Sequence, residues 1–432
     1  MRTFLTIWAA LLAISIQSQS RLSLNEAINT SIEKANILKI AENNLKIAEL
    51  NKTKEAAGFS PNINVGASNT FLLNSVKNKL ADGRLIQGDN AASNNTQMGA
   101  QLSYIIFEGN LKNNLLAFNR ETYQVASSEL KNQINQVVFK TIELYVQAWV
   151  NQKTLEQNQQ LLKLANERAT LAQNRFQAGS SSKIDWLQTQ IEVNQQEAAI
   201  ILLNQQLTNS KTILLNHLQM NPETQIILQD SIVFETPSQT QVEISQNAFL
   251  KQLIHQKNRA EWNSKMAKST RYPTLTGNLA YNYSRNQNEV GFLLLSQNFG
   301  PQANLTLNWN IYNRGTVKRN IKTAFINLET ARIALEQAKL DIELSLRNAQ
   351  NNLEGSQKTL KLHQSAFDMA KESYMLSKER YQSGKISIFE LNQSQGILAS
   401  SMQKKYESLN QKLMAEAHIL LETNQLDLII QK

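Results

Sequence analysis

The feature that most constrains this chain is a heptad pattern that runs from Ile321 to Tyr381. One row repeats every seventh residue from Ile321, and a companion row starts four residues later at Phe325. Six of nine positions are apolar in the first row and seven of nine in the second, with no proline between them. This 4-3 spacing predicts a coiled-coil helix whose pattern does not slip. At about 1.5 Å per residue, a helix over 315–382 is roughly 100 Å long, which is more than a compact domain needs.

The same pattern occurs twice in the chain, at a constant offset of 205 residues (Ile321 against Leu116). Both occurrences end on a similar motif, which is Arg-Phe-Gln-Ala-Gly over 175–179 and Arg-Tyr-Gln-Ser-Gly over 380–384. Two unrelated long helices would not keep one offset along their whole length. The sequence therefore predicts an internal duplication.

The first twenty residues have the pattern of a secretory signal peptide. Arg2 precedes a mostly apolar run from Phe4 to Ile16, and a polar, small-residue segment with Ser18 and Ser20 follows. This order predicts cleavage near Ser18 to Ser20, and the apolar run is shorter than the about 20 residues that a membrane helix needs. The chain has no cysteine, which excludes disulfides, thiolate metal sites and thioether lipidation of the mature N-terminus.

The charge and motif content disfavour nucleic-acid binding and catalysis. The formal net charge is +9, but the basic residues are scattered, so we interpret them as solvated helix faces and expect no nucleic-acid partner. The four histidines lie far apart in sequence, and no phosphate-binding loop, nucleophile elbow, zinc-protease or dinucleotide motif occurs. We therefore expect no metal, no cofactor and no enzyme activity.

Segments of alternating apolar and polar residues precede each long helix. They cover 62–71, 98–106, 275–283 and 303–311, with expected loops over 74–95 and 284–302. Segments of about ten residues with one apolar and one polar side are typical of transmembrane β-strands. Half-buried strands of a soluble sheet are the alternative, and the signal peptide and long loops favour the membrane. Four strands cannot close a barrel, and open edges are not tolerated in lipid, so other copies of the chain must complete it.

The remaining elements follow from helix caps, glycines and prolines. Ser23 and Glu26 form an expected capping box, and Pro61, Pro273 and Pro301 are expected at element boundaries. Further helices are predicted over 23–57 (with a break near Asn36), 183–218, 241–269 and 387–422. The predicted organisation is a signal peptide (1–20), a first structural repeat (21–220), a linker (221–240) with a short strand at 225–228, and a second structural repeat (241–432).

This order of elements, together with several motifs, resembles the TolC family of outer-membrane efflux proteins. The matching motifs are 22–27 (Leu-Ser-Leu-Asn-Glu-Ala), 59–61 (Phe-Ser-Pro), 272–275 (Tyr-Pro-Thr-Leu) and the two glycine motifs that end the long helices. The resemblance implies a mainly α fold with a membrane β-barrel. In it, long antiparallel coiled-coil helices form an α-barrel tunnel, and a homotrimer completes a 12-stranded barrel with four strands from each chain.

The resemblance also implies a function. The chain would be the outer-membrane channel of a tripartite efflux or type I secretion system, with a helical tunnel extending into the periplasm. It would passively export substrates that an inner-membrane pump delivers through a periplasmic adaptor (a membrane fusion protein), and outer-membrane lipid would surround its strands. A structural or adhesive trimeric coiled-coil surface protein is the alternative function, and a soluble periplasmic scaffold is a third.

In the family, the glycine turns lie at the periplasmic tip, where the tunnel is closed at rest, and acidic residues beyond them surround the entrance. Six residues past each glycine stand Asp185 and Glu390. Gln393 stands where some members have a further Asp, and Tyr381 resembles a gate tyrosine. These four residues are the expected channel entrance; ordinary solvated helix ends are the alternative. The expected adaptor-docking tip consists of Gly179, Ser180, Lys183, Ser383, Gly384 and Lys385.

Three further positions bear on the gate. Ile386 stands where some family members carry a gating arginine. Arg175 and Arg380, at the ends of the two long helices, are candidates to tie neighbouring helices together.

Overall fold

The computed structural model describes residues 20–229, 232, 234 and 244–426. Almost all of the predicted signal peptide (1–19) and part of the predicted linker (235–240) lie outside the described residues. The described chain divides into two compact units, and each unit draws on both halves of the sequence. The helical unit contains the described residues of 1–42, 128–251 and 337–432, and the sheet unit contains 43–127 and 252–336.

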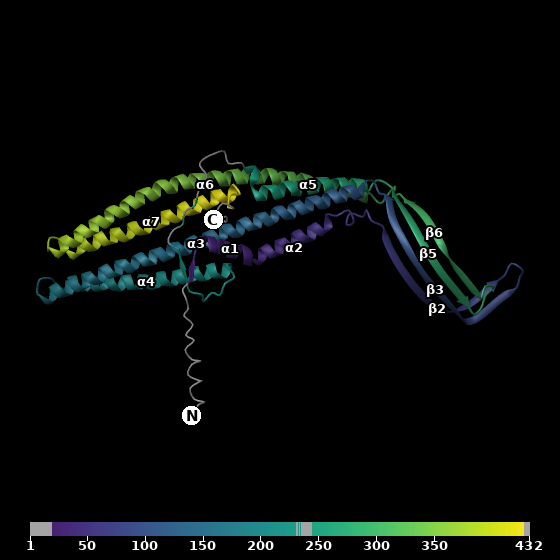
Figure 1. Ribbon diagram of the computed structural model, residues 1–432, viewed down its shortest axis with the longest axis horizontal. Coiled ribbons are helices and arrows are strands. Elements are labelled where there is room, and N and C mark those ends of the chain that lie inside the picture. The colour runs from purple at the N-terminus through teal and green to yellow at the C-terminus, as the bar shows by residue number, and fades with distance from the viewer. Residues whose placement is uncertain (1–19, 230–231, 233, 235–243, 427–432) are drawn as a thin grey trace, which may run out of the picture. The chain divides into compact units, whose positions relative to one another are not determined.

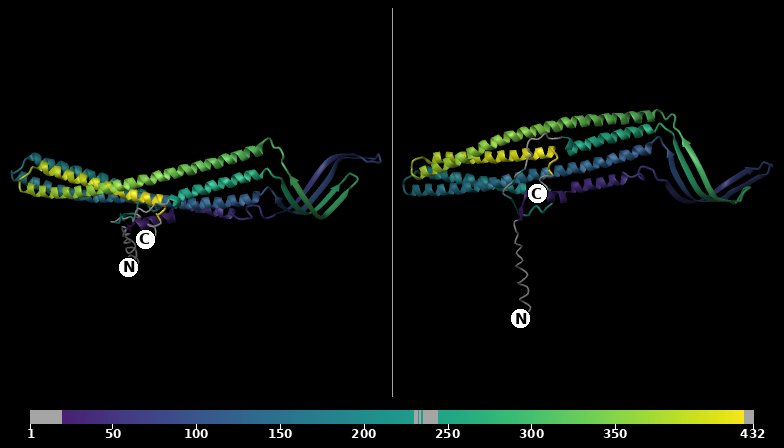
Figure 2. Two further views of the ribbon diagram at one scale, coloured as in Figure 1. Left: turned by 90° about the horizontal axis from the view of Figure 1, so that it is seen from above. Right: turned by 45° about the horizontal axis from the view of Figure 1, so that its top comes forward.

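Two antiparallel helical hairpins make up most of the helical unit. The first pairs the later part of α3 (Leu111–Gln177) with α4 (Lys183–His217), and the second pairs the later part of α6 (Thr316–Gln382) with α7 (Ile388–Glu422) (Figures 1 and 2). Both long helices have 67 residues and both return helices have 35. The predicted long and return helices are confirmed to within a residue of their bounds. Within the described residues, no helix combines the length and apolar character needed to cross a membrane.

The main core of the helical unit surrounds the middle of α3. Strands β1 (Ser20–Leu22) and β4 (Ile226–Leu228) pair in parallel, which confirms the predicted short strand, and they pack on α3 with α4, α7 and α1 (Leu24–Lys34). Buried α3 side chains complete the hydrogen bonding of this small sheet. The Tyr145 hydroxyl donates to the Leu22 carbonyl at 2.8 Å and accepts from the Gln229 amide at 3.2 Å.

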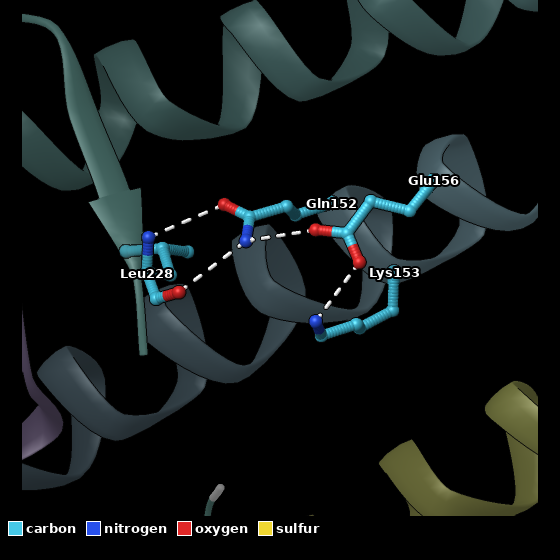
Figure 3. A network of polar contacts seen from close by, with 4 residues as sticks. All are labelled: Gln152, Lys153, Glu156 and Leu228. Atoms are coloured by element: carbon cyan, nitrogen blue, oxygen red, sulfur yellow. Dashed lines mark hydrogen bonds and ion pairs between the residues drawn. The ribbon is translucent and has the colours of Figure 1, made fainter. Parts of the chain in front are cut away.

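Gln152 of α3 serves as a further partner of β4 (Figure 3). The Leu228 amide donates to its Oε1 at 3.2 Å, and its Nε2 donates to the Leu228 carbonyl at 3.3 Å. The same Nε2 donates to Glu156, which is ion-paired with Lys153 at 2.9 Å. One amide side chain thus satisfies a buried backbone donor and acceptor that have no third strand to pair with.

The N-terminal helices follow the predicted break but not the predicted end. The capping box of Ser23 and Glu26 is confirmed, and the helix is interrupted at Ala35 between α1 and α2 (Asn36–Asn51). The predicted continuation to Ala57 is wrong. The Asn51 side chain donates to the Ile47 carbonyl, which ends the helix, and turns follow. A short 3₁₀ turn (Ile244–Gln246) precedes α5 (Ala248–Ser269); residues 241–243 of the helix predicted there lie outside the described residues.

The sheet unit contains one antiparallel sheet of order β2-β3-β5-β6 (Figure 1). Its strands are β2 (Asn62–Lys79), β3 (Leu85–Phe107), β5 (Thr274–Asn288) and β6 (Leu295–Asn308). The central pair, β3 and β5, comes from different halves of the sequence, so the sheet joins them. β2 and β6 are its edges.

The strands are longer than predicted, so the expected loops at 74–95 and 284–302 are wrong. Residues 80–84 and 289–294 connect the paired strands instead. Polar residues, most often asparagine, occupy much of the added strand segments of the first hairpin, which weakens the apolar and polar alternation that marks a strand, although the backbone ladder continues. Pro301 lies inside β6 opposite Tyr281 rather than at a boundary, and an edge strand is where a proline is tolerated.

The heptad pattern of α6 slips once, contrary to prediction. In its first part Ala324 and Ala338 are buried, whereas the predicted companion Phe325 is 54% exposed. From Leu346 onward the predicted companion row faces the core, although Leu353 and Leu360 are only partly buried. The buried positions Ala338, Ile342 and Leu346 are therefore spaced 4-4, which is a stutter. It lies close to residue 337, where α6 passes from the sheet unit into the helical unit.

Candidate functional site

The tips of the two hairpins have the same turn geometry. Gly179 and Gly384 both have φ of +73°, which is the left-handed conformation. In each turn the glycine amide and the next amide donate back to the last helical turn: Gly179 to Phe176 and Ser180 to Arg175, Gly384 to Tyr381 and Lys385 to Arg380. This is a Schellman motif, and a Cβ would strain its left-handed residue.

The predicted entrance carboxylates lie in capping boxes at the start of the return helices. The Ser182 hydroxyl accepts from the Asp185 amide, and Asp185 accepts in return from the Ser182 amide at 3.2 Å. Ser387 and Glu390 form the same box, with the returning bond at 3.0 Å. Asp185 also accepts from the Ser181 hydroxyl at 2.8 Å, and this bond is the main reason that the pKa of Asp185 lies below its usual value. Both carboxylates therefore have a local structural role.

Arg175 joins the two hairpins at their tips. Its Nη2 donates to the carbonyls of Tyr381 at 2.8 Å and Gln382 at 2.7 Å, at the C-terminal end of α6. Its guanidinium lies 4.6 Å from the centre of the Tyr381 ring. A cation at the C-terminal end of a helix also interacts favourably with the helix dipole. Tyr381 itself is only 4% exposed, so it lies beneath Arg175 rather than on a free surface.

A second polar contact between the hairpins lies one to two turns further from the tip. The Arg168 side chain is 2% exposed; its Nη2 pairs with Glu192 of α4 at 2.9 Å, and its Nη1 donates to Asn392 of α7. Nearby, Lys378 of α6 pairs with Glu167 of α3 at 2.8 Å. Sequence reasoning missed this cluster, because an arginine between two seam positions gives no periodic signal.

The other predicted tip residues are exposed. Gln393 lines a groove of about 520 Å³ between α4 and α7, together with Glu192 and Phe389. The six predicted docking residues are all exposed on the two turns and the first residue of α4: Gly179, Ser180, Lys183, Ser383, Gly384 and Lys385. All six residues are thus exposed at the hairpin tips. Asp185 and Glu390 lie a few residues further along the chain, in the first turns of the return helices.

The sheet has one apolar and one polar face. Residues in register share a face, because neighbouring side chains along a strand point to opposite sides. Two successive rows of one face are Ile63, Leu102, Leu279 and Ala303, then Val65, Ala100, Tyr281 and Pro301. The interleaved rows of the other face are Asn62, Ser103, Asn278 and Asn304, then Asn64, Gln101, Ala280 and Gln302. The apolar residues are exposed, as Val65, Leu279 and Leu305 illustrate.

Metal binding has no support in the geometry. Among the residues whose placement is described, no three His, Asp or Glu side chains gather closely enough to hold an ion. The contacts at the tips are caps, ion pairs and hydrogen bonds between helices.

A family model and solved structures match this chain. The model described as "Outer membrane efflux protein" matches residues 27–218 and 240–422. The Campylobacter jejuni CmeC outer membrane channel has a TM-score of 0.80 at 14% identity, covering 93% of this chain and 85% of that one.

Two further solved structures are similar in fold. The outer-membrane channel OprN has a TM-score of 0.78 at 14% identity, with coverage of 93% and 90%. The outer membrane protein VceC from Vibrio cholerae has a TM-score of 0.76 at 13% identity, with coverage of 93% and 95%. Curated protein sequences give no significant match.

Proposed function

This chain belongs to the outer membrane efflux protein family, and on that premise we propose that three copies of it form a passive exit duct across the outer membrane and the periplasm. A pump in the inner membrane would supply the energy and deliver substrates through a periplasmic adaptor, in an efflux or type I secretion system. The observation that carries the proposal is the sheet, which has an exposed apolar face, a polar face and two open edges.

The sheet supports both the membrane location and the need for partners. An exposed apolar face is favourable against lipid, and a polar face suits a wet lumen. The unpaired amides and carbonyls of β2 and β6 would each cost several kcal/mol in hydrocarbon, so β6 of one copy must pair with β2 of the next. Three copies of four strands would close a 12-stranded barrel.

The equal bounds of the hairpins support the proposed duplication. Each element of the second hairpin begins and ends 205 residues after its counterpart (Leu111 against Thr316, His217 against Glu422). We propose that residues 21–220 and 241–432 are two structural repeats joined by the linker 221–240, after a signal peptide at 1–20. Three chains would then contribute six similar hairpins to a helical tunnel.

We place the closed entrance of the tunnel at the hairpin tips. Asp185, Glu390 and Gln393 would face the narrowing lumen, and Tyr381 would act through Arg175, which holds the two hairpins together. One oxygen of each carboxylate makes the capping bond, which leaves the other free to act on passing ions. Three copies of two carboxylates in a narrow entrance would attract cations.

The exposed turns are the proposed docking surface for the adaptor. A duct that is closed at rest must open when the adaptor binds, and both turns are exposed, with open space around their glycines. Bulky substitutions at Ser383 or Lys385 should therefore abolish export while trimers remain in the membrane. Normal export from such variants would move the docking surface elsewhere.

Single-channel recording of the purified protein in a planar bilayer tests the proposed conduit. Because the closed entrance is narrowed and not sealed to small ions, the wild type should conduct weakly. Asp185→Asn combined with Glu390→Gln should lower cation preference and relieve block by multivalent cations. Asn and Gln still accept the capping bond, so the helices should remain intact. The matched control, Ser182→Ala with Ser387→Ala, removes the caps but keeps the carboxylates and should retain the selectivity. Absence of conductance would contradict the proposed function, and unchanged selectivity would place the carboxylates outside the lumen.

A further inference from the structure

The packing of the first hairpin against the second depends on one side of α3. Leu164 and Leu171 pack on a core cluster that includes Tyr374, Tyr381 and Leu391 of the second hairpin. One turn further on, Arg175 binds the carbonyls at the end of α6 and stacks on Tyr381. Two leucines and an arginine on one side of α3 thus contribute to the contact, together with the polar contacts of Glu167 and Arg168.

The same positions on α6 carry the same kinds of side chain, but these side chains are exposed. The counterparts of Leu164 and Leu171, 205 residues later, are Met369 and Leu376, which are 62% and 54% exposed. The counterpart of Arg175 is Arg380, which is exposed, and its guanidinium makes no hydrogen bond or ion pair with any residue that the structure describes. Two large apolar side chains and an arginine in one stripe are typical of an unfilled interface.

We propose that this stripe of Met369, Leu376 and Arg380 packs on the first hairpin of a second copy, and that Arg380 binds the C-terminal carbonyls of that copy's α3. This inference rests on the proposed trimer and specifies its contact at the tip. Arg380 would donate to the carbonyls of Phe176 and Gln177 in the second copy, as Arg175 donates to those of Tyr381 and Gln382 in its own chain.

The first hairpin offers a suitable receiving surface. Phe176 occupies the position of Tyr381, and its ring stacks on Trp186 of α4 with centres 5.8 Å apart and planes 7° apart. Gly179 forms the same Schellman turn as Gly384, so the carbonyls at the end of α3 point out of the helix as those at the end of α6 do. An arginine over Phe176 would therefore find an aromatic face and two carbonyl acceptors in the arrangement that Arg175 already uses.

The Arg168–Glu192 ion pair of the first hairpin has no ionic counterpart at the corresponding positions of the second hairpin. Ser373 stands for Arg168, and Ile397 stands for Glu192. Leu187 on the first hairpin stands for Asn392, and both Leu187 and Ile397 are exposed large apolar side chains. A second copy would cover them together, so the contact between copies would be apolar at the place where the intrachain contact is ionic.

Cysteine cross-linking tests the proposed contact without background, because the chain has no cysteine of its own. In the chain, Glu167 and Lys378 are ion-paired at 2.8 Å, so Glu167→Cys with Lys378→Cys should cross-link within one chain. The counterparts of these two residues are Glu372 and Gln173, both exposed. Glu372→Cys with Gln173→Cys, treated with a short bismaleimide in the purified detergent-solubilised particle, should give covalent dimers and trimers on a denaturing gel.

The outcomes separate this inference from the proposed function. Cross-linked dimers and trimers from the 173/372 pair, with only intrachain products from the 167/378 pair, would support it. A particle of three chains in which the 173/372 pair gives no interchain product would overturn the contact and leave the proposed conduit standing. A particle that contains a single chain would overturn both.

A second measurement tests Arg380 directly. Arg380→Ala should lower the temperature at which the trimer dissociates by several degrees, and Arg380→Lys should recover only part of the loss, because lysine lacks the forked donor. The matched control, Lys371→Ala, removes another exposed cation of α6 and should leave the dissociation temperature unchanged. An Arg380→Ala trimer as stable as the wild type would overturn the role of Arg380.

Discussion

The two long helices have equal lengths and corresponding bounds, but only one of them is buried on two sides. In the middle of α3, Val138, Ile142 and Val146 are fully buried on the side that carries β1, β4 and α1. Their counterparts on α6 are Glu343, Arg347 and Asn351, which are exposed. The two helices thus share one heptad seam, but the face outside the seam is buried on α3 and exposed on α6.

The difference indicates a division of labour between the two hairpins. α3 organises the core of its own chain, whereas α6 keeps one narrow seam and leaves the rest of its surface exposed. Near the tip the contrast continues, with Leu164 and Leu171 packed on α3 and Met369 and Leu376 exposed on α6. The two long helices therefore share their length and their caps, whereas the face outside the seam differs. On α3 this face packs in the core of its own chain, and on α6 it is available to a second copy.

The largest expected difference between the two helices comes from placing a carboxylate at corresponding positions of α3 and α6. Ile142→Asp buries an unpaired carboxylate in the core and should lower the free energy of unfolding by about 4 kcal/mol or more. Arg347→Asp, at the corresponding exposed position, should change it by less than about 0.5 kcal/mol. Thermal unfolding followed by circular dichroism measures both. Similar losses from the two variants would mean that α3 and α6 do not differ as described.

The next largest effect concerns the ion pair that only the first hairpin has. Arg168→Ala leaves Glu192 and Asn392 without their partner, so it should cost about 3 kcal/mol of stability. Ser373→Ala, at the corresponding position of α6, should be close to neutral. A chemical denaturation series measures the difference. An Arg168→Ala variant as stable as Ser373→Ala would remove the ionic contact from the account.

The glycine turns are a feature in which the two hairpins should not differ, so substitutions at Gly179 and Gly384 should lower stability equally. Gly179→Ala and Gly384→Ala each force a Cβ into a left-handed conformation and should cost about 1 kcal/mol. Gly355 lies inside α6 with open space around it, so Gly355→Ala should stabilise by about 0.8 kcal/mol. Melting temperatures of the three variants test this, and unequal losses at the two turns would contradict their equivalence.

The smallest effect is a pH dependence that belongs to the first hairpin alone. His217, the last residue of α4, contacts the Thr141 hydroxyl at 2.9 Å, and burial is the main reason that its pKa lies below the usual 6.5. Its counterpart on α7 is Glu422. The folded state then binds fewer protons than the unfolded state, so stability should fall as the pH drops below about 6.5.

Substitution isolates the contribution of His217 from that of the other titrating groups. His217→Gln should flatten the slope of unfolding free energy against pH between about 6.5 and the lowered pKa, relative to the wild type. Urea unfolding at several pH values measures this slope. A slope that is unchanged in His217→Gln would assign the pH dependence to other groups.

Local signals explain which parts of the fold could be predicted from the sequence. Helix starts and ends at Ser182, Gly179, Ser387 and Gly384 depend on capping contacts within a few residues, so their prediction succeeded to within one residue. The strand ends were predicted wrongly, because residues such as Asn74 and Ser93 extend the backbone ladder without an apolar face to mark the strand. The stutter at Ile342 was not predicted, because Phe325 is as apolar as Ala324, the neighbouring residue that is buried in its place.

The candidate site divides in the same way. The turn glycines follow from sequence motifs, and the structure contains them. The capping boxes of Asp185 and Glu390 were not predicted, although a serine three residues before each carboxylate is the signal for them. The contact of Arg168 with Asn392 depends on how the two hairpins meet across 224 residues of sequence, and no spacing rule indicates it. The burial of Tyr381 under Arg175 is likewise a tertiary result that a motif of five residues cannot specify.

The number of chains in the purified particle tests the central claim most directly. The mass of the detergent-extracted protein, corrected for bound detergent by light scattering combined with refractive index and absorbance, should correspond to three chains of 48.9 kDa, less any cleaved signal peptide. A four-stranded sheet with two open edges needs other copies of the chain to close in lipid, and the number three is what the resemblance to the family implies. A stable, membrane-inserted particle with the mass of one chain would contradict the account.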